Sequence, residues 1–339
     1  MRAFVVTGPG RSELADVPGP RPEPGQAVID VERAGVCGTD VELFTGDMAY
    51  LRQGHARFPI RLGHEWCGTV SAVGGGVDPG WLGQRVAGDT MLGCGACERC
   101  RSGRAHVCED RREVGIRGGF PGALAEQLAM PVTALHPLPD AVDGVAGALV
   151  EPGGSALRAV WGAGLEPGER VLVLGPGTIG LLAAMFALAD GAEVHVLGLT
   201  RPSLDFAAAL GVHGAWTEAD LPRLPFDAVI DASNAPGLPA KALDLVEPGK
   251  RVVYVGVAGR PSVIDTRSLV LKDVTAVGIL GASAGLPGTI ERYADGSVDP
   301  RPLVAATVGL ADVGRVLGGW RPGGAGPGPK VQVDPRESV

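Results

Sequence analysis

Six residues near the middle of the chain, Gly175-Pro176-Gly177-Thr178-Ile179-Gly180, constrain its fold more than any other feature. They follow the apolar run 171–174, which is typical of a buried strand, and they open the apolar segment 179–189, which is predicted to be helical. Glycines at this spacing allow a tight turn and let the backbone approach a pyrophosphate at the helix N-terminus. The pattern predicts a dinucleotide-binding βαβ unit. Its cofactor contacts are expected at Gly175, Gly177, Thr178, Ile179 and Gly180.

The chain around this motif alternates short apolar strands with helix-like segments. Four strands are expected, at residues 171–174, 193–197, 228–231 and 251–255. Three helices are expected between and after them, at residues 179–189, 203–210 and 238–246. Strands spaced in this way form a parallel sheet covered by helices.

The first 150 residues have a different character. Four strands are expected there, at residues 3–7, 27–31, 69–73 and 85–87. Breaker segments rich in glycine and proline interrupt this region, as at residues 18–25. We therefore expect an α/β protein in which a β-rich part is combined with a doubly wound Rossmann part that has a parallel sheet.

The composition excludes several classes of protein. With 45% hydrophobic and 20% charged residues, the 339-residue chain can bury a sizeable core and is not globally disordered. Its net charge of −8 argues against nucleic acid or a membrane surface as a partner. The longest apolar run is far shorter than the roughly 20 residues needed to span a bilayer, and no signal-peptide pattern is visible. We expect a soluble, cytoplasmic protein whose partner is a small molecule.

Four of the six cysteines gather in one short window, at Cys94, Cys97, Cys100 and Cys108. Disulfides are rare in a reducing compartment, and four thiolates at these spacings can enclose one tetrahedral Zn²⁺ with no open position. The window is therefore predicted to be a structural zinc site. A DNA-binding zinc ribbon is the alternative, because several arginines lie nearby, but the acidic chain and the nucleotide motif argue against it.

A second set of possible metal ligands is dispersed along the chain. Cys37 lies in the segment GVCGTD, His64 and Glu65 lie in GHEWCG, and Glu151 precedes a proline near the point where the two parts meet. One thiolate, one imidazole and one or two carboxylates suit a catalytic Zn²⁺ that keeps an exchangeable position. Their spacing alone does not distinguish a metal site from ordinary core or surface residues.

Taken in order, the segments CGTD, GHExxG, CxxCxxCx7C, Glu-Pro and GxGxxG resemble the zinc-dependent medium-chain dehydrogenase/reductase superfamily over essentially the whole chain. The Glu151-Pro152 pair makes the chain most similar to the branch of sorbitol, threonine and cyclitol dehydrogenases. The resemblance implies a GroES-like catalytic domain at residues 1–153 and 284–339, and a Rossmann domain at residues 154–283. It also implies a homodimer or homotetramer, for which residues 274–280 are the candidate strand to pair across subunits.

The resemblance assigns metal ligands residue by residue. It implies that Cys37, His64, Glu65 and Glu151 hold the catalytic zinc, with Glu151 bound directly or through water. Asp40 matches the carboxylate that orients the ligating histidine. Together with the cysteine window, each chain would then bind two zinc ions.

The resemblance also implies a route for the proton. Thr39 matches the hydroxyl that hydrogen-bonds the substrate oxygen and takes or passes on its proton. Glu42 stands where many relatives carry a histidine that relays this proton to solvent. A carboxylate with a raised pKa can do the same work near neutrality, and the alternative is a solvated residue on a helix.

The preference between cofactors depends on the end of the second Rossmann strand. Relatives that use NAD place an acidic residue there, about 20 residues after the glycine motif, to bind the ribose hydroxyls. This chain has Gly198, and Thr200, Arg201 and Ser203 follow at once. A glycine removes the negative charge and opens room, and these three side chains can bind a 2′-phosphate. We expect NADP to be preferred over NAD, the alternative being that Arg201 stacks on adenine or faces solvent.

The expected function is that of a zinc-dependent oxidoreductase. It would transfer a hydride between a nicotinamide cofactor and a secondary alcohol or ketone of a sugar, polyol or cyclitol-like metabolite. One alternative is a reductase of the same fold that acts on an activated C=C bond, since the usual relay histidine is absent; the complete ligand set disfavours it. The other is a non-enzymatic zinc-ribbon binding protein, which would fail to bind a nicotinamide cofactor.

Overall fold

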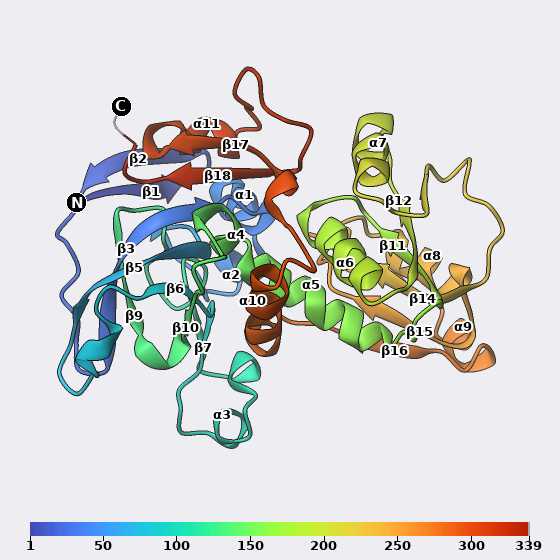
Figure 1. Ribbon diagram of the computed structural model, residues 1–339, viewed down its shortest axis with the longest axis horizontal. Coiled ribbons are helices and arrows are strands. Elements are labelled where there is room, and N and C mark those ends of the chain that lie inside the picture. Colours follow the sequence, from blue (N-terminus) through green and yellow to red (C-terminus); the bar gives the residue numbers. More distant parts are fainter. Residues whose placement is uncertain (338–339) are drawn as a thin grey trace.

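The computed structural model describes residues 1–337 and consists of two parts that lie side by side (Figure 1). One part is built on a seven-stranded mixed sheet and contains the N-terminal strands together with the last strand of the chain. The other is built on a six-stranded parallel sheet covered by helices. The predicted α/β class, with a β-rich part and a Rossmann part, is confirmed. No helix among the described residues is long and apolar enough to cross a bilayer.

The seven-stranded sheet has the order β10-β6-β5-β3-β18-β17, and β9 also pairs with β3. Its strands are β3 (Gln26–Gly35), β5 (Glu65–Val73), β6 (Arg85–Gly88), β9 (Gln127–Pro131), β10 (Leu135–Pro137), β17 (Val304–Gly309) and β18 (Lys330–Asp334). Strand β18 lies between β3 and β17 and runs antiparallel to β3. A segment that follows the Rossmann part in the chain therefore completes the sheet begun at the N-terminus.

Smaller elements surround this sheet. A three-stranded sheet has the order β2 (Arg11–Asp16), β1 (Arg2–Gly8), β4 (Ile60–Arg61), and a two-stranded sheet joins β7 (Met91–Leu92) to β8 (Arg112–Glu113). The short helices of this part are α1 (Gly38–Thr45), α2 (Ala49–Arg52), α3 (Glu98–Arg101), α4 (Gly144–Gly147) and α11 (Val313–Leu317). Strand β4 matters below, because it ends three residues before His64.

The parallel sheet has the order β13-β12-β11-β14-β15-β16. Its strands are β11 (Arg170–Leu174), β12 (Glu193–Leu197), β13 (Gly214–Trp216), β14 (Phe226–Asp231), β15 (Val246–Tyr254) and β16 (Thr275–Gly278). The helices of this part are α5 (Val150–Ala163), α6 (Thr178–Ala189), α7 (Arg201–Ala209), α8 (Leu238–Leu245), α9 (Thr266–Leu271) and α10 (Leu286–Ala294).

The expected Rossmann strands and helices are present, with bounds that differ by a few residues. Helix α7 begins at Arg201 rather than at residue 203, because Thr200 is its N-cap and a proline suits the first turn. Residue 246 begins β15 instead of ending α8. The short strand β13 was not predicted, since three residues carry too little periodicity to be recognised.

Helix α5 joins the two parts (Figure 1). It contacts β5 of the mixed sheet, α6 of the Rossmann part and α10. One apolar cluster accordingly runs from Cys67 and Leu138 through α5 to α6 and β11. The predicted boundary between residues 153 and 154 falls inside this helix, and the exact domain limits stay a prediction.

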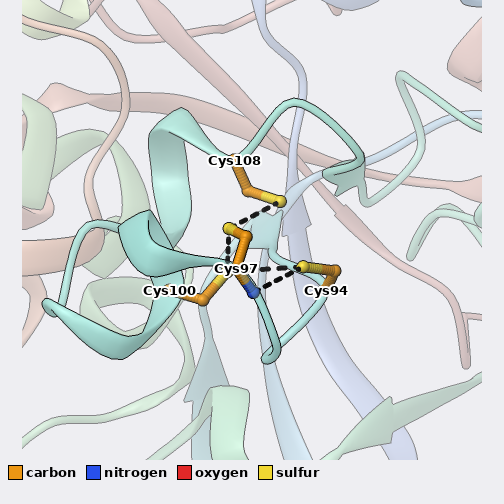
Figure 2. Close-up of side chains that lie close together, drawn as sticks. All are labelled: Cys94, Cys97, Cys100 and Cys108. Atoms are coloured by element: carbon orange, nitrogen blue, oxygen red, sulfur yellow. Dashed lines mark hydrogen bonds between the residues drawn. The ribbon is translucent and has the colours of Figure 1, made fainter.

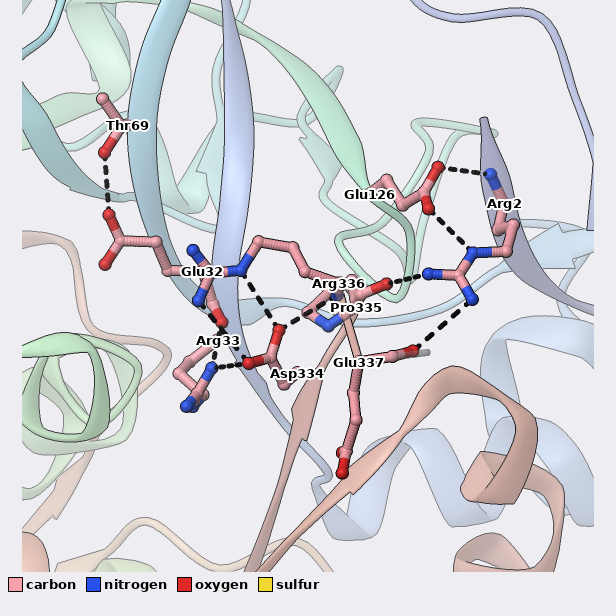
Figure 3. A network of polar contacts seen from close by, with 9 residues as sticks. All are labelled: Arg2, Glu32, Arg33, Thr69, Glu126, Asp334, Pro335, Arg336 and Glu337. Atoms are coloured by element: carbon pink, nitrogen blue, oxygen red, sulfur yellow. Dashed lines mark hydrogen bonds and ion pairs between the residues drawn. The ribbon is translucent and has the colours of Figure 1, made fainter. Parts of the chain in front are cut away.

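Polar contacts tie the residues after β18 to the N-terminal strands (Figure 3). The guanidinium of Arg2 donates to the carbonyl of Pro335 at 3.0 Å and to the carboxylate of Glu126 at 2.8 Å. Arg33 of β3 forms an ion pair with Asp334 at the end of β18. These contacts hold β18 against β3, and this fixes the position of the first residue of β18, Lys330.

Candidate active site

Cys37, His64 and Glu65 come together where β3 ends and β5 begins. One possible ligand atom from each lies within 4.8 Å of the others. The pairing of Gly35 with Glu65 in the β3–β5 ladder brings the two segments to the same level. Gly63 aims His64 by a left-handed turn (φ +99°), and a Cβ there would lie 2.6 Å from the Leu124 nitrogen. A thiolate, an imidazole and a carboxylate in one small space are a donor set that suits zinc.

Asp40 lies fully buried behind these residues. Its carboxylate accepts the N–H of Cys37 at 2.9 Å and that of Gly63 at 3.3 Å. One carboxylate oxygen also lies 3.4 Å from Nδ1 of His64, a fully enclosed atom that has no well-aligned hydrogen-bond partner. Burial lowers the pKa of His64, but Asp40 and Cys37, through their charges and hydrogen bonds, together outweigh it and raise that pKa well above its usual range.

Lys330, which was not predicted to belong to the site, lies against Glu65. Its Nζ donates to the two carboxylate oxygens of Glu65 at 2.8 and 2.6 Å and to the carbonyl of Val36 at 3.0 Å. Both side chains are deeply buried, with 3% of Lys330 and 1% of Glu65 exposed. Burial lowers the pKa of Lys330, but the charges of Glu65, Cys37 and Asp40 and the hydrogen bond to Glu65 together outweigh it and raise the pKa. Glu65 is thus close enough to ligate a metal and is also held by a buried cation.

Glu151 lies in the first turn of α5 and is buried, but it is not part of the group within 4.8 Å. The pKa of Glu151 is raised to about 7, mainly by burial; Glu65 and Asp89 add to the rise, and His64 and Lys330 oppose it. Burial makes this carboxyl group costly to ionise unless a cation lies beside it. Its position is adjacent to the three grouped residues rather than among them.

Thr39 and Glu42 both lie on α1, immediately after Cys37. They are three residues apart, so they share one face of the helix. Thr39 is partly buried, and so is Glu42. Burial, followed by the charge of Asp47, raises the pKa of Glu42.

The four cysteines of the window also come together, in the segment that carries α3 (Figure 2). The sulfur of Cys97 lies 3.5 Å from that of Cys100 and 3.8 Å from that of Cys108, and Cys94 and Cys100 are 3.9 Å apart. Four sulfurs bound to one zinc at about 2.3 Å in a tetrahedron would be about 3.8 Å from one another. Backbone N–H groups of Ala96 and Cys97 lower the pKa of Cys94 to about 6, which favours the thiolate that zinc requires.

The glycine motif lies between β11 and α6. Gly175 has a left-handed backbone (φ +98°), and Gly177 is the N-cap of α6. A Cβ on Gly180 would lie 2.0 Å from the carbonyl oxygen of Gly175, so only glycine permits this close contact of helix and turn. Thr178 and Ile179 form the first turn, whose free N–H groups can bind a phosphate.

Gly198 directly follows β12, but its missing side chain does not open a space. A Cβ there would lie 2.8 Å from Cγ of Pro176 and 3.0 Å from the side chain of Leu204. The space left by the missing side chain is filled by the proline of the glycine motif. It is therefore not free for a phosphate, contrary to what the sequence had led us to expect. The backbone N–H of Gly198 donates to the carbonyl of Trp216 at 3.0 Å and so ties this turn to β13.

The three polar residues that follow Gly198 lie at the start of α7. The hydroxyls of Thr200 and Ser203 are 2.8 Å apart. Arg201 is exposed and forms an ion pair with Asp220, whose carboxylate also accepts the hydroxyl of Thr217 at 2.8 Å. A phosphate that binds Arg201 would therefore compete with a carboxylate of the same chain, which sequence reasoning missed because Asp220 lies beyond β13.

Two family models match the chain. One describes the alcohol dehydrogenase GroES-like domain and covers residues 23–140; the other describes zinc-binding dehydrogenases and covers residues 178–295. Among curated relatives, an L-threonine 3-dehydrogenase of Saccharopolyspora erythraea is 32% identical over 83% of this chain and 84% of its own length. A 2-dehydro-3-deoxy-L-galactonate 5-dehydrogenase of Pseudoalteromonas atlantica is 31% identical over 86% and 87%.

A solved structure extends this comparison to the full fold. It is that of a protein of Sinorhizobium meliloti 1021, described as a zinc-binding dehydrogenase bound to NADP. It superimposes with a TM-score of 0.89 at 26% identity, over 98% of this chain and 99% of the other.

Proposed function

We propose, from the premise that the chain belongs to the zinc-dependent medium-chain dehydrogenases, that it interconverts a secondary alcohol and a ketone of a sugar-, polyol- or cyclitol-like metabolite. The observation that carries this proposal is the convergence of Cys37, His64 and Glu65 beside Thr39. The two curated relatives, named for the oxidation of small polar metabolites, support the substrate class. A non-enzymatic zinc-ribbon protein does not agree with membership of this family.

Cys37, His64 and Glu65 are proposed to hold the catalytic zinc, and Glu151 would bind it directly or through water. When bound, zinc supplies a Lewis acid that lowers the pKa of the substrate hydroxyl. Asp40 positions the site from behind: it accepts the N–H of Cys37 and faces the ring of His64. Because Lys330 neutralises Glu65, the protein can bury this carboxylate without an unpaired charge.

Thr39 is proposed to hydrogen-bond the substrate oxygen and to take its proton. Glu42, on the same face of α1, would then pass the proton to water. Its raised pKa suits this role, because a carboxylate relays protons best when its pKa approaches the working pH. The glycine motif at the start of α6 would hold the pyrophosphate of the cofactor, whose nicotinamide would supply the hydride acceptor when bound.

A second, structural zinc is proposed at Cys94, Cys97, Cys100 and Cys108, which would bring the total to two per chain. The sulfur–sulfur distances of 3.5 to 3.9 Å support this assignment. The four thiolates would fill the coordination sphere, so this zinc would stabilise the segment and take no part in the reaction.

NADP is proposed as the preferred cofactor. No acidic residue stands at the end of β12, and a side chain at Gly198 would clash with Pro176. Arg201, Thr200 and Ser203 offer donors to a 2′-phosphate once the contact of Arg201 with Asp220 opens.

The enzyme is proposed to be a cytoplasmic homodimer or homotetramer. Strand β16 pairs only with β15 and leaves its other edge unpaired among the described residues. Val270 and Leu271 of α9, which precede β16 in the chain, are largely exposed. A subunit contact would cover such apolar residues. All six cysteines are free thiols, as is usual in a reducing compartment. Light scattering coupled to size exclusion would give the number of subunits.

One experiment tests the reaction and its class together. The purified zinc-loaded enzyme is offered sugars, polyols, cyclitols and α,β-unsaturated carbonyl compounds with NAD(H) and NADP(H), and the absorbance of the reduced cofactor is followed. We expect oxidation of a polyol and none by the Cys37→Ser variant. Reduction of C=C bonds without oxidation of any alcohol would contradict the proposal.

A further inference from the structure

A cavity of about 300 Å³ lies on the β-rich part of the molecule, between the three-stranded sheet and residues 116–121. Two arginines line it, and the other ten residues are apolar or glycine; no acid, histidine or lysine contributes. The ten are Val5, Val17, Pro18, Ala56, Pro59, Ile60, Ile116, Gly119, Phe120 and Pro121. None of them is a zinc ligand or a cofactor residue proposed above.

One of the arginines, Arg61, has no ion-pair partner among residues 1–337. It ends β4, where it pairs with Val5 of β1 through the backbone. Its Nε atom is fully enclosed and has no hydrogen-bond partner, and among the described residues no acid forms an ion pair with its guanidinium. Burial lowers the pKa of Arg61 to about 10. Charges that are removed from water are normally paired in folded proteins, and this partly buried guanidinium has no anion beside it among the described residues.

The second arginine, Arg57, is exposed and lies at the mouth of the same cavity. A third, Arg112, places its guanidinium 5.0 Å from the centre of the Phe120 ring, which forms part of the wall. The cavity thus combines positive charge with an apolar lining. Inorganic phosphate or sulfate would satisfy the arginines but leave the apolar walls in contact with water.

We propose that this cavity binds a small organic carboxylate. Its carboxylate would accept two N–H bonds from the terminal nitrogens of Arg61, with Arg57 as a second cation, and its apolar part would contact Ile116 and Phe120. The volume lies at the lower end of the range for ligand pockets, so the ligand is small, of the size of benzoate or isovalerate. The inference is independent of the reaction proposed above.

The test uses the zinc-loaded enzyme without substrate. Benzoate, isovalerate, methyl benzoate and sulfate are titrated by calorimetry, and the melting temperature is followed in parallel. We expect one equivalent of carboxylate to bind per chain with a saturable rise in melting temperature, and methyl benzoate and sulfate to bind at least tenfold more weakly. The Arg61→Met variant should lose binding, while Arg260→Gln, at an exposed arginine of the Rossmann part, should retain it.

Folding of the Arg61→Met variant provides an independent measurement. Since the change replaces an unpaired, mostly buried cation by an apolar side chain of similar length, the free variant should melt at the same temperature as the wild type or higher. Equal binding of benzoate to Arg61→Met and wild type would overturn the proposal. So would tighter binding of sulfate than of carboxylates, no binding of either, or loss of carboxylate binding in Cys37→Ser, which would place the ligand at the catalytic site.

Discussion

The buried pair of Lys330 and Glu65 offers the sharpest test of how the site is held together. In the Lys330→Met variant, the carboxylate of Glu65 loses the Nζ atom that lies 2.6 and 2.8 Å from its oxygens. With only 1% of Glu65 exposed, water does not replace this partner. Breaking one side of a buried pair typically costs about 3–5 kcal/mol. We therefore expect the free energy of unfolding to fall by about that amount.

The assay is urea unfolding of protein kept free of zinc, because zinc bound to Glu65 would itself replace the lost counter-charge. It compares the wild type, Lys330→Met, Glu65→Leu and the double variant Lys330→Met/Glu65→Leu. The double variant removes both charges, so it should recover most of the stability lost in Lys330→Met, with a coupling of about 2–3 kcal/mol. Activity should not return, because Glu65 is also a proposed zinc ligand. A loss below about 1 kcal/mol in Lys330→Met, or strictly additive effects in the cycle, would refute the reasoning.

The remaining predictions concern zinc, proton transfer and the cofactor. Elemental analysis of protein purified without chelator should find about two zinc equivalents per chain; Cys37→Ser should lose one equivalent and all activity, whereas Cys100→Ser should impair folding. An active Cys37→Ser enzyme would disprove the catalytic assignment. Glu42→Gln should slow alcohol oxidation by on the order of 10²-fold. Because Glu42 must be ionised to accept the proton and its pKa is raised, activity should fall as the pH drops toward the acid side of neutrality, and this limb of the pH–rate profile should vanish in the variant. An unchanged rate and profile would leave Glu42 as a structural residue. Arg201→Ala should lower kcat/KM for NADP far more than for NAD; equal or better kcat/KM of the wild type with NAD would contradict the cofactor preference.

Local patterns accounted for most of what the sequence could predict. The turn at Gly175 and the apolar runs beside it are determined within a few residues of chain, so strand, turn and helix could be predicted together. The same holds for the cysteine window, where all four sulfurs lie within one short segment. Such features need no knowledge of how distant segments pack.

Long-range contacts could not be predicted, because they depend on how distant segments of the chain pack. Lys330 meets Glu65 only because β18 inserts beside β3, and nothing in the residues around Lys330 indicates this pairing. The one available signal was its rarity, as one of four lysines in an arginine-rich chain. Arg201 likewise looked free to bind a phosphate until the fold placed Asp220 beside it. Charges that compensate each other across the fold are thus what single-sequence reasoning misses.

The insertion of β18 between β3 and β17 also has a consequence for biosynthesis. During synthesis, β3, β5 and the nearby Cys37 and His64 leave the ribosome long before residues 330–334 are added. The entire Rossmann part is made in between. Until then the mixed sheet lacks an inner strand, and Glu65 lacks its counter-charge. Since domains generally fold as units during synthesis, the nucleotide-binding part is expected to mature first on the ribosome. The catalytic centre would be assembled among the last steps, which keeps an unfinished chain from acting as an enzyme.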